Sequence, residues 1–204
     1  MIDAALRRPA AFQAALLAVP PEDRERWLDD LLGLEEWPAD GPDLPRGCTP
    51  YLPCSARLLL EAIDAAEIDA SDVLVDVGSG LGRALALVHL FTGAEAIGIE
   101  VQSGLAGRAV ELAAQWQLPR VQTIQGDAAL LAGGMAAGTV FFFYSPFGSD
   151  RMEAVTDALR PLAATRPLRL CFVDVPPPER PWLVPQRRRA GSSSGLTLVR
   201  STGG

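Results

Sequence analysis

Three alternating glycines follow an apolar run near the middle of the chain. The run covers residues 73–77 and contains Asp76, and the glycines are Gly78, Gly80 and Gly82. Glycine allows a backbone to turn tightly and to approach a ligand more closely than any side chain would permit. A strand that leads through such a turn into a helix also presents backbone N–H groups and a positive helix dipole to the ligand. This spacing therefore predicts a site for a nucleotide-like cofactor.

Two further carboxylates follow apolar runs farther along the chain. Glu100 ends the run 95–100, at about the separation of twenty residues from the glycines at which an acidic residue binds ribose hydroxyls. Asp127 follows the run that begins at Val121. Ligands of open α/β sheets bind at the carboxyl ends of the strands, so these residues and Asp76 are expected at one edge of a sheet. A glycine turn without a ligand, and an acidic residue that only favours a helix N-terminus, are the alternative interpretations.

The spacing of the glycines distinguishes between cofactors. The dinucleotide fingerprint G-x-G-x-x-G requires its third glycine at position 83, where this chain has arginine. The spacing G-x-G-x-G, with an acidic residue two positions before the first glycine, resembles motif I of class I S-adenosylmethionine-dependent methyltransferases. This resemblance implies S-adenosylmethionine as the cofactor. The residues that it assigns to the cofactor are Asp76, Gly78, Ser79, Gly80 and Gly82, with Glu100 on the ribose and with Asp127 and the amide of Ala128 on the adenine edge.

The resemblance extends over about residues 50–175. The segment Tyr51-Leu52-Pro53-Cys54, a helix, and then Asp-x-Gly-Ser-Gly-x-Gly-Arg are similar to a group of seven-strand enzymes that includes small protein-lysine methyltransferases. In that group the tyrosine-proline loop folds over the methionine end of the cofactor, which implies that Tyr51 acts as a lid. The resemblance also implies a seven-stranded, Rossmann-like methyltransferase fold. The methyl acceptor of such an enzyme would be a protein or a small molecule, with a protein amine as one candidate.

A fourth apolar run, 139–144, leads into the segment that would face the acceptor. In the resembled family this segment is motif IV, which implies that Tyr144 and Ser145 orient the acceptor and that Phe147 forms a wall of its site. Transfer of the methyl group by direct displacement needs no covalent intermediate, and it depends on positioning and on the exclusion of water. Packing at a strand end is the alternative role for these three side chains.

Two other functions compete with this interpretation. A non-catalytic module that binds S-adenosylmethionine or a nucleotide, and acts through a protein partner, would contain the same turn. An NAD-dependent oxidoreductase is disfavoured by Arg83. Titration with S-adenosylmethionine distinguishes a cofactor site from none.

Helices and breakers precede the glycine turn. Helices are expected at about residues 3–18 and 21–34, the second of them opened by two prolines. Prolines and glycines predict an irregular crossing segment over residues 37–53. Further helices are expected at 55–67 and at 81–90.

Strands and helices alternate from residue 55 to Asp174, which predicts a doubly wound, mostly parallel α/β sheet. We divide the chain into a helical extension with its proline-rich connection, residues 1–45, and the methyltransferase domain, residues 46–204. A length of 204 residues, of which 49% are hydrophobic, suits a single main core.

The composition excludes several classes of enzyme and partner. All 18 basic residues are arginine, so phosphate binding of the Walker type, pyridoxal Schiff bases and kinase-type transfer lack their lysine. A net charge of −7, with residues 187–189 as the one dense basic patch, argues against a nucleic-acid partner. No apolar run is long enough to span a membrane, so we expect a cytoplasmic protein without a membrane partner.

The cysteines and the histidine have no metal-site spacing. Cys48, Cys54 and Cys171 are predicted to be reduced, partly buried thiols, with a disulfide between the first two as the less favoured alternative. His89 lies within a predicted helix, and no metal site is expected. Residues 191–195 match the hydrolase pattern G-x-S-x-G but lack its flanking strand and helix and a later histidine, so we interpret them as a hairpin connection.

Overall fold

The sheet has seven strands in the order β3-β2-β1-β4-β5-β7-β6. The computed structural model describes residues 4–34, 36, 38–42, 44–186 and 195–202. Strands β1 to β5 are parallel, and β7 runs antiparallel to both of its neighbours. The strands are β1 Val73–Val77, β2 Glu95–Glu100, β3 Val121–Gln125, β4 Val140–Tyr144, β5 Arg169–Val173, β6 Leu183–Pro185 and β7 Leu196–Ser201. This arrangement confirms the predicted doubly wound, mostly parallel, seven-stranded sheet.

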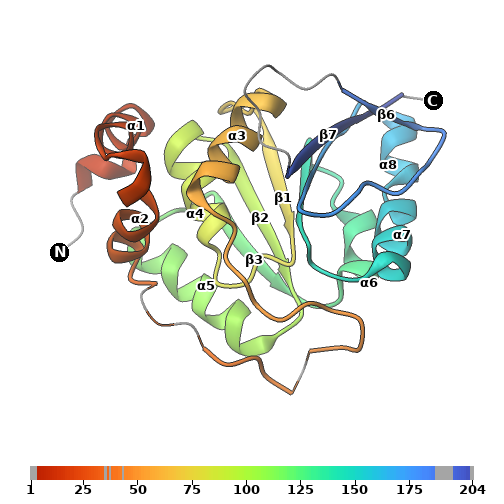
Figure 1. Cartoon of the computed structure of the whole chain (residues 1–204), viewed down its shortest axis with the longest axis horizontal. Coiled ribbons are helices and arrows are strands. Elements are labelled where there is room, and N and C mark those ends of the chain that lie inside the picture. The colour runs from red at the N-terminus through yellow and green to blue at the C-terminus, as the bar shows by residue number, and fades with distance from the viewer. Residues whose placement is uncertain (1–3, 35, 37, 43, 187–194, 203–204) are drawn as a thin grey trace.

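Helices cover both faces of the sheet (Figure 1). Helices α3 Ala56–Ala66, α4 Arg83–Thr92 and α5 Ser103–Trp116 contribute to one core cluster. Helices α6 Ala128–Leu131, α7 Ser149–Ala158 and α8 Arg160–Thr165 contribute to a second cluster. Short 3-10 turns are η1 Ala4–Arg7, η2 Pro21–Asp23 and η3 Ala132–Gly134. None of the helices described is long and apolar enough to cross a bilayer.

The central strands are apolar because both of their faces are covered. Phe141, Phe142 and Phe143 of β4 are all buried, and the ring of Phe143 stacks on Phe172 of β5 with 4.8 Å between centroids. Continuous apolar runs are typical of such parallel strands. The buried sheet therefore provides a rigid support for the loops at its carboxyl edge.

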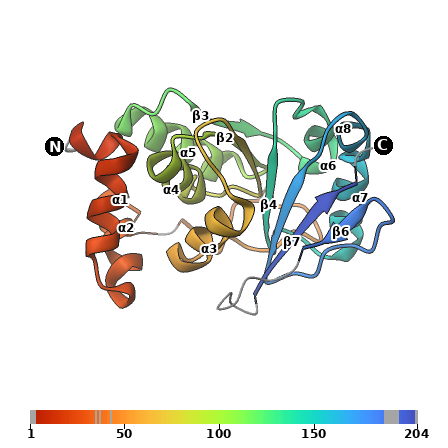
Figure 2. The ribbon, with the colours of Figure 1, turned by 90° about the horizontal axis from the view of Figure 1, so that it is seen from above.

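The N-terminal helices α1 Pro9–Ala18 and α2 Arg24–Leu32 pack outside α3 and α4, at the end of the molecule opposite β6 and β7 (Figure 2). The expected continuous helix over residues 3–18 is wrong, because Pro9 starts a new helix at its first position after the 3-10 turn. The expected helix over 21–34 likewise consists of a 3-10 turn followed by α2, which Gly33 ends in a left-handed conformation.

The helix expected at 81–90 begins two residues later, since Gly82 still has a left-handed φ of 77°. The proline-rich connection has no helix or extended strand among its described residues. Figure 1 shows it passing along the lower edge of the sheet between α2 and α3. We call residues 44–54, the later part of this connection together with Cys54, the strap.

Candidate functional site

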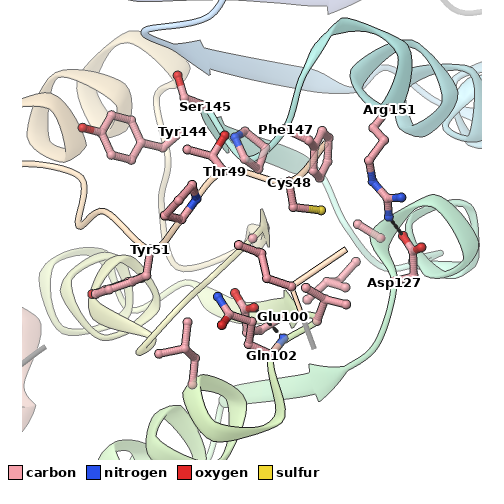
Figure 3. A pocket seen from close by; sticks show the side chains of 18 of the residues that line it. Cys48, Thr49, Tyr51, Glu100, Gln102, Asp127, Tyr144, Ser145, Phe147 and Arg151 are labelled. Carbon is pink, nitrogen blue, oxygen red and sulfur yellow. Dashed lines mark hydrogen bonds and ion pairs between the residues drawn. The ribbon is translucent and has the colours of Figure 1, made fainter. Parts of the chain in front are cut away.

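A pocket lies at the carboxyl ends of the strands, beneath the strap (Figure 3). The strap contributes one wall, and the loops after β1, β2, β3 and β4 contribute the others. The predicted site residues that line it are Tyr51, Gly78, Glu100, Asp127, Ala128, Tyr144, Ser145 and Phe147. These eight residues, which lie between positions 51 and 147 of the sequence, therefore converge on one cavity. The strand-end pattern predicted such a convergence.

The glycine turn packs directly against the strap and the loop after β4. Gly80 has a φ of +53°, and a Cβ atom there would lie 2.2 Å from the Tyr51 ring. Gly78 has a φ of +86°, and its Cβ would lie 2.9 Å from Pro146. Both positions require glycine, because a side chain would be strained and would displace these neighbours.

Four of the predicted cofactor residues do not line the pocket, namely Gly80, which packs against Tyr51, and Gly82, Ser79 and Asp76. Gly82 precedes α4, and a Cβ atom there would lie 3.1 Å from Ala109 of α5. Ser79 is 6% exposed, and no described residue pairs with its hydroxyl group. Asp76 is 4% exposed, near the end of β1. Burial, and then repulsion from Glu100, raise the pKa of Asp76 to about 7.

Glu100 joins the glycine turn to the end of β2. One of its carboxylate oxygens accepts a hydrogen bond from the Gly80 amide at 2.8 Å, and the other accepts one from the Gln102 amide at 2.8 Å. The residue is 5% exposed, and burial raises the pKa of Glu100 although these hydrogen bonds favour its charged form. Each carboxylate oxygen can accept a second hydrogen bond, so the group can still bind hydroxyls in the pocket.

Gln102 connects the site to the start of the proline-rich connection. Its side-chain oxygen accepts a hydrogen bond from the Gly41 amide at 2.7 Å, and its side-chain nitrogen donates to Asp40 at 2.9 Å. Asp40 also accepts a hydrogen bond from the Tyr51 amide at 2.9 Å. The segment that carries Tyr51 is thus attached to the residues that follow Glu100.

On the far side of the pocket, Asp127 forms an ion pair with Arg151 (Figure 3). Asp127 also caps α6 by accepting a hydrogen bond from the Ala129 amide at 2.9 Å. Burial acts to raise the pKa of Asp127, but the hydrogen bonds from Arg151 and Ala129 lower it below its usual value. The guanidinium carbon of Arg151 lies 5.9 Å from the centroid of the Phe147 ring, within the range of a cation–π contact.

The expected acceptor residues occupy the loop after β4. Ser145 donates a hydrogen bond to the carbonyl oxygen of Asp174 at 2.9 Å, and both residues have left-handed backbones with φ of 40° and 52°. Tyr144 lies on the same side of the pocket as Tyr51 in Figure 3, and burial raises the pKa of its hydroxyl group. Cys48 pairs with Phe147 in an isolated antiparallel bridge, which holds the strap on this loop.

Sequence reasoning did not assign Cys48, Gln102 or Arg151 to the site, although all three line the pocket. Gln102 stands two positions after the predicted ribose carboxylate, and this proximity was an available clue. Cys48 and Arg151 belong to segments without a recognised motif, and they reach the pocket through the bridge and the ion pair.

The predicted thiols are confirmed, because Cys48, Cys54 and Cys171 are free and the last two are buried. The alternative disulfide between the first two is therefore absent. His89 packs within its helix, with Nδ1 2.7 Å from the Ala94 carbonyl oxygen. The predicted hairpin at 191–195 and the arginines at 187–189 lie outside the described residues, apart from Gly195.

No protein-family model matches the chain, and no curated protein matches it. Among solved structures, an RNA methyltransferase from Salinibacter ruber in complex with S-adenosyl-L-homocysteine has a TM-score of 0.58 and 24% identity, over 74% of this chain and 92% of that chain. The yhhF protein from Escherichia coli has a TM-score of 0.58 and 14% identity, over 78% and 89%. The magnesium protoporphyrin IX methyltransferase ChlM from Synechocystis with bound SAM has a TM-score of 0.52 and 15% identity, over 71% and 76%. The chain therefore has the Rossmann-like fold found in these methyltransferase structures.

Proposed function

We propose that the chain is an S-adenosylmethionine-dependent methyltransferase that transfers the methyl group by direct displacement. The observation that carries this proposal is the convergence of the glycine turn, Glu100 and Asp127 at the carboxyl edge of a sheet in the order 3-2-1-4-5-7-6. Solved structures with the same fold are named as methyltransferases and contain S-adenosyl-L-homocysteine or SAM. The carboxyl edge is also where open α/β sheets bind their ligands.

The donor and acceptor groups of the pocket fit this cofactor. Glu100 would accept hydrogen bonds from the two ribose hydroxyls, and Asp127 with the Ala128 amide would contact the adenine edge. The turn from Gly78 to Gly82 would hold the methionine end, and the buried carboxylate of Asp76 behind it suits a positively charged ligand. Tyr51 would close over this end, since its ring already lies on Gly80.

The residues of the chain would act by orientation and by the exclusion of water. The bound cofactor supplies an electrophilic methyl group on a sulfonium. The Ser145 hydroxyl donates a hydrogen bond to the backbone carbonyl oxygen of Asp174, so its oxygen lone pairs remain able to accept a hydrogen bond from the acceptor. Tyr144 can donate a hydrogen bond, and the buried Phe147 would form an apolar wall. Holding two reactants in the correct geometry can supply most of the rate enhancement in such a displacement.

Three acceptor classes are compatible with this site. The net charge of −7 tolerates a cationic acceptor such as a protein amine. The structures that share the fold include one named for RNA and one named for a magnesium porphyrin, which adds nucleic acids and small molecules. A labelling experiment that separates proteins, nucleic acids and small molecules will distinguish the three classes.

Calorimetric titration of the protein tests the cofactor. We expect S-adenosyl-L-homocysteine and S-adenosylmethionine to bind, and NADH not to bind. Tight NADH binding without a response to the other two ligands would overturn the proposal.

Incubation of cell extract with the protein and radiolabelled S-adenosylmethionine, followed by separation of proteins, nucleic acids and small molecules, tests the reaction. Label above the level of a Glu100→Gln control in any one fraction supports transfer. Binding of the cofactor without label in any fraction would instead support the non-catalytic module.

A further inference from the structure

Arg83 connects three segments that lie far apart in the sequence. It is the first residue of α4 and directly follows the glycine turn, and its side chain is only 5% exposed. Its guanidinium donates to Asp29 of α2 at 2.6 Å, to Glu25 of α2 at 2.7 Å, and to the carbonyl oxygen of Cys54 at the end of the strap. A single buried cation therefore joins the turn, the N-terminal helix and the strap.

Glu25 also holds the segment that follows the strap. One of its oxygens binds Arg83, and the other accepts a hydrogen bond from the Ala56 amide at 2.7 Å. Ala56 is the first residue of α3, whose N-cap is Ser55. The strap consequently ends in two contacts with α2, one through Arg83 and one directly through Glu25.

These contacts limit the movement of Tyr51. Only Leu52 and Pro53 separate Tyr51 from Cys54, and the proline ring fixes one of the backbone torsions between them. The Tyr51 amide is held on the other side by Asp40 at 2.9 Å. Release of Cys54 would therefore remove the anchor on the C-terminal side of Tyr51, while Asp40 still holds its amide.

We propose that Arg83, held by Glu25 and Asp29, is a positioning residue that keeps the strap closed over the glycine turn, so that α2 is a working part of the cofactor site. This inference rests on the proposed function, because a closed strap matters most if a cofactor binds beneath it. Lysine cannot replace this arginine fully, since the guanidinium supplies a planar set of donors to three partners while an ammonium is a point charge.

Hydrogen exchange in the ligand-free protein provides the first test. We expect Arg83→Lys and Glu25→Gln to raise the exchange rate of the Thr49 and Tyr51 amides, which donate to Pro146 and Asp40, by roughly tenfold. Glu25→Gln keeps the shape of the side chain, and it serves if Arg83→Lys folds poorly. Asp72→Asn is the matched control, because Asp72 forms a buried ion pair with Arg169 just before the start of β1, away from the strap.

Titration with S-adenosyl-L-homocysteine provides the second test. We expect Arg83→Lys and Glu25→Gln each to weaken its binding roughly tenfold, and to weaken it no further when Tyr51→Ala is already present. Asp72→Asn should lower the melting temperature and leave the affinity unchanged. If the Arg83 and Glu25 variants lower only the melting temperature, with strap exchange and affinity as in Asp72→Asn, the inference is wrong. If the unmodified protein binds no ligand, the proposed function fails, whereas the exchange test still decides whether Arg83 holds the strap.

Discussion

The ring of Tyr51 lies on the backbone of Gly80, so that a Cβ atom at position 80 would stand 2.2 Å from the Cε2 atom of the ring. The amide of the same glycine donates a hydrogen bond to Glu100 at 2.8 Å. Gly80 thus contacts both the proposed lid and the proposed ribose carboxylate. A change at this position should affect both groups at once.

Gly80→Ala should lower the free energy of unfolding by at least about 1 kcal/mol, because alanine is strained at a φ of +53° and its methyl group would displace the Tyr51 ring. It should also weaken binding of S-adenosyl-L-homocysteine. Urea denaturation and calorimetry measure the two effects. Gly107→Ala is the control, since Gly107 lies within α5 with no atom within 4 Å of a Cβ there, and it should be stabilising. Equal effects of the two substitutions would contradict the close contact at Gly80.

Glu100→Gln should weaken binding of S-adenosyl-L-homocysteine by roughly ten- to a hundredfold, because hydrogen bonds to a charged group contribute about 1.5–3 kcal/mol. The side-chain NH₂ of the new glutamine would also face one of the two backbone N–H groups that now donate to Glu100, and two donors cannot form a hydrogen bond with each other. Calorimetric titration measures the loss. Glu95→Gln, at the opposite end of β2, should bind as the unmodified protein does. An unchanged affinity in the Glu100 variant would contradict the proposed hydrogen bonds between Glu100 and the ribose hydroxyls.

Asp76→Asn should be more stable than the unmodified protein at pH 8, by more than about 1 kcal/mol. Burial raises the pKa of Asp76 from 3.8 to about 7, so the folded protein binds a proton that the unfolded chain has released between these values. The contribution of this proton to stability is complete below pH 3.8, falls above that value, and is lost as the pH rises through 7. The advantage of the variant should therefore shrink towards pH 4. Denaturation at several pH values measures it, and parallel curves for both proteins would contradict it.

S-adenosylmethionine should bind more tightly as the pH rises from 6 towards 7.5, roughly severalfold, because a cationic ligand favours the ionised form of Asp76. Asp76→Asn should bind more weakly and without this pH dependence. Titrations of both proteins in the same buffers cancel the ionisation of the ligand itself. A pH dependence retained in the Asp76 variant would assign it to another group.

Asp127→Ala should cost about 1 kcal/mol of stability through loss of the α6 cap, and it should weaken cofactor binding. The ion pair with Arg151 is lost in the same variant. Asp150→Ala, at an exposed carboxylate near the start of α7, is the control. Thermal unfolding measures the change in stability, and titration measures the change in affinity for the cofactor. An unchanged affinity would contradict the proposed contact between Asp127 and the adenine edge.

Local sequence patterns predicted the elements that carry their own signal. The strands β1 and β2 coincide with the expected runs 73–77 and 95–100, because buried parallel strands are continuous apolar segments. The glycine turn was recognisable for a similar reason, since its conformation depends on residues that are adjacent in the chain. The break of the first helix at Pro9 could also have been predicted from the missing N–H of proline.

Contacts between distant residues could not be predicted in this way. The local patterns include Arg83 as the residue in place of a third glycine and as the end of the glycine motif, whereas its partners Asp29, Glu25 and Cys54 lie 54, 58 and 29 positions away. The pairing of Asp127 with Arg151 is of the same kind. Such contacts depend on how the helices pack, and no single segment contains that information.

The glycine turn is preorganised, because the Gly80 amide donates a hydrogen bond to Glu100 and the Gly78 and Ser79 amides donate to the carbonyl oxygen of Ile99. Its conformational entropy is lost when the chain folds, so a ligand that enters the pocket need not order the turn again. We expect the strap, which forms one wall of the pocket, to be the part that moves, so that its opening rate would limit how quickly ligands enter and leave.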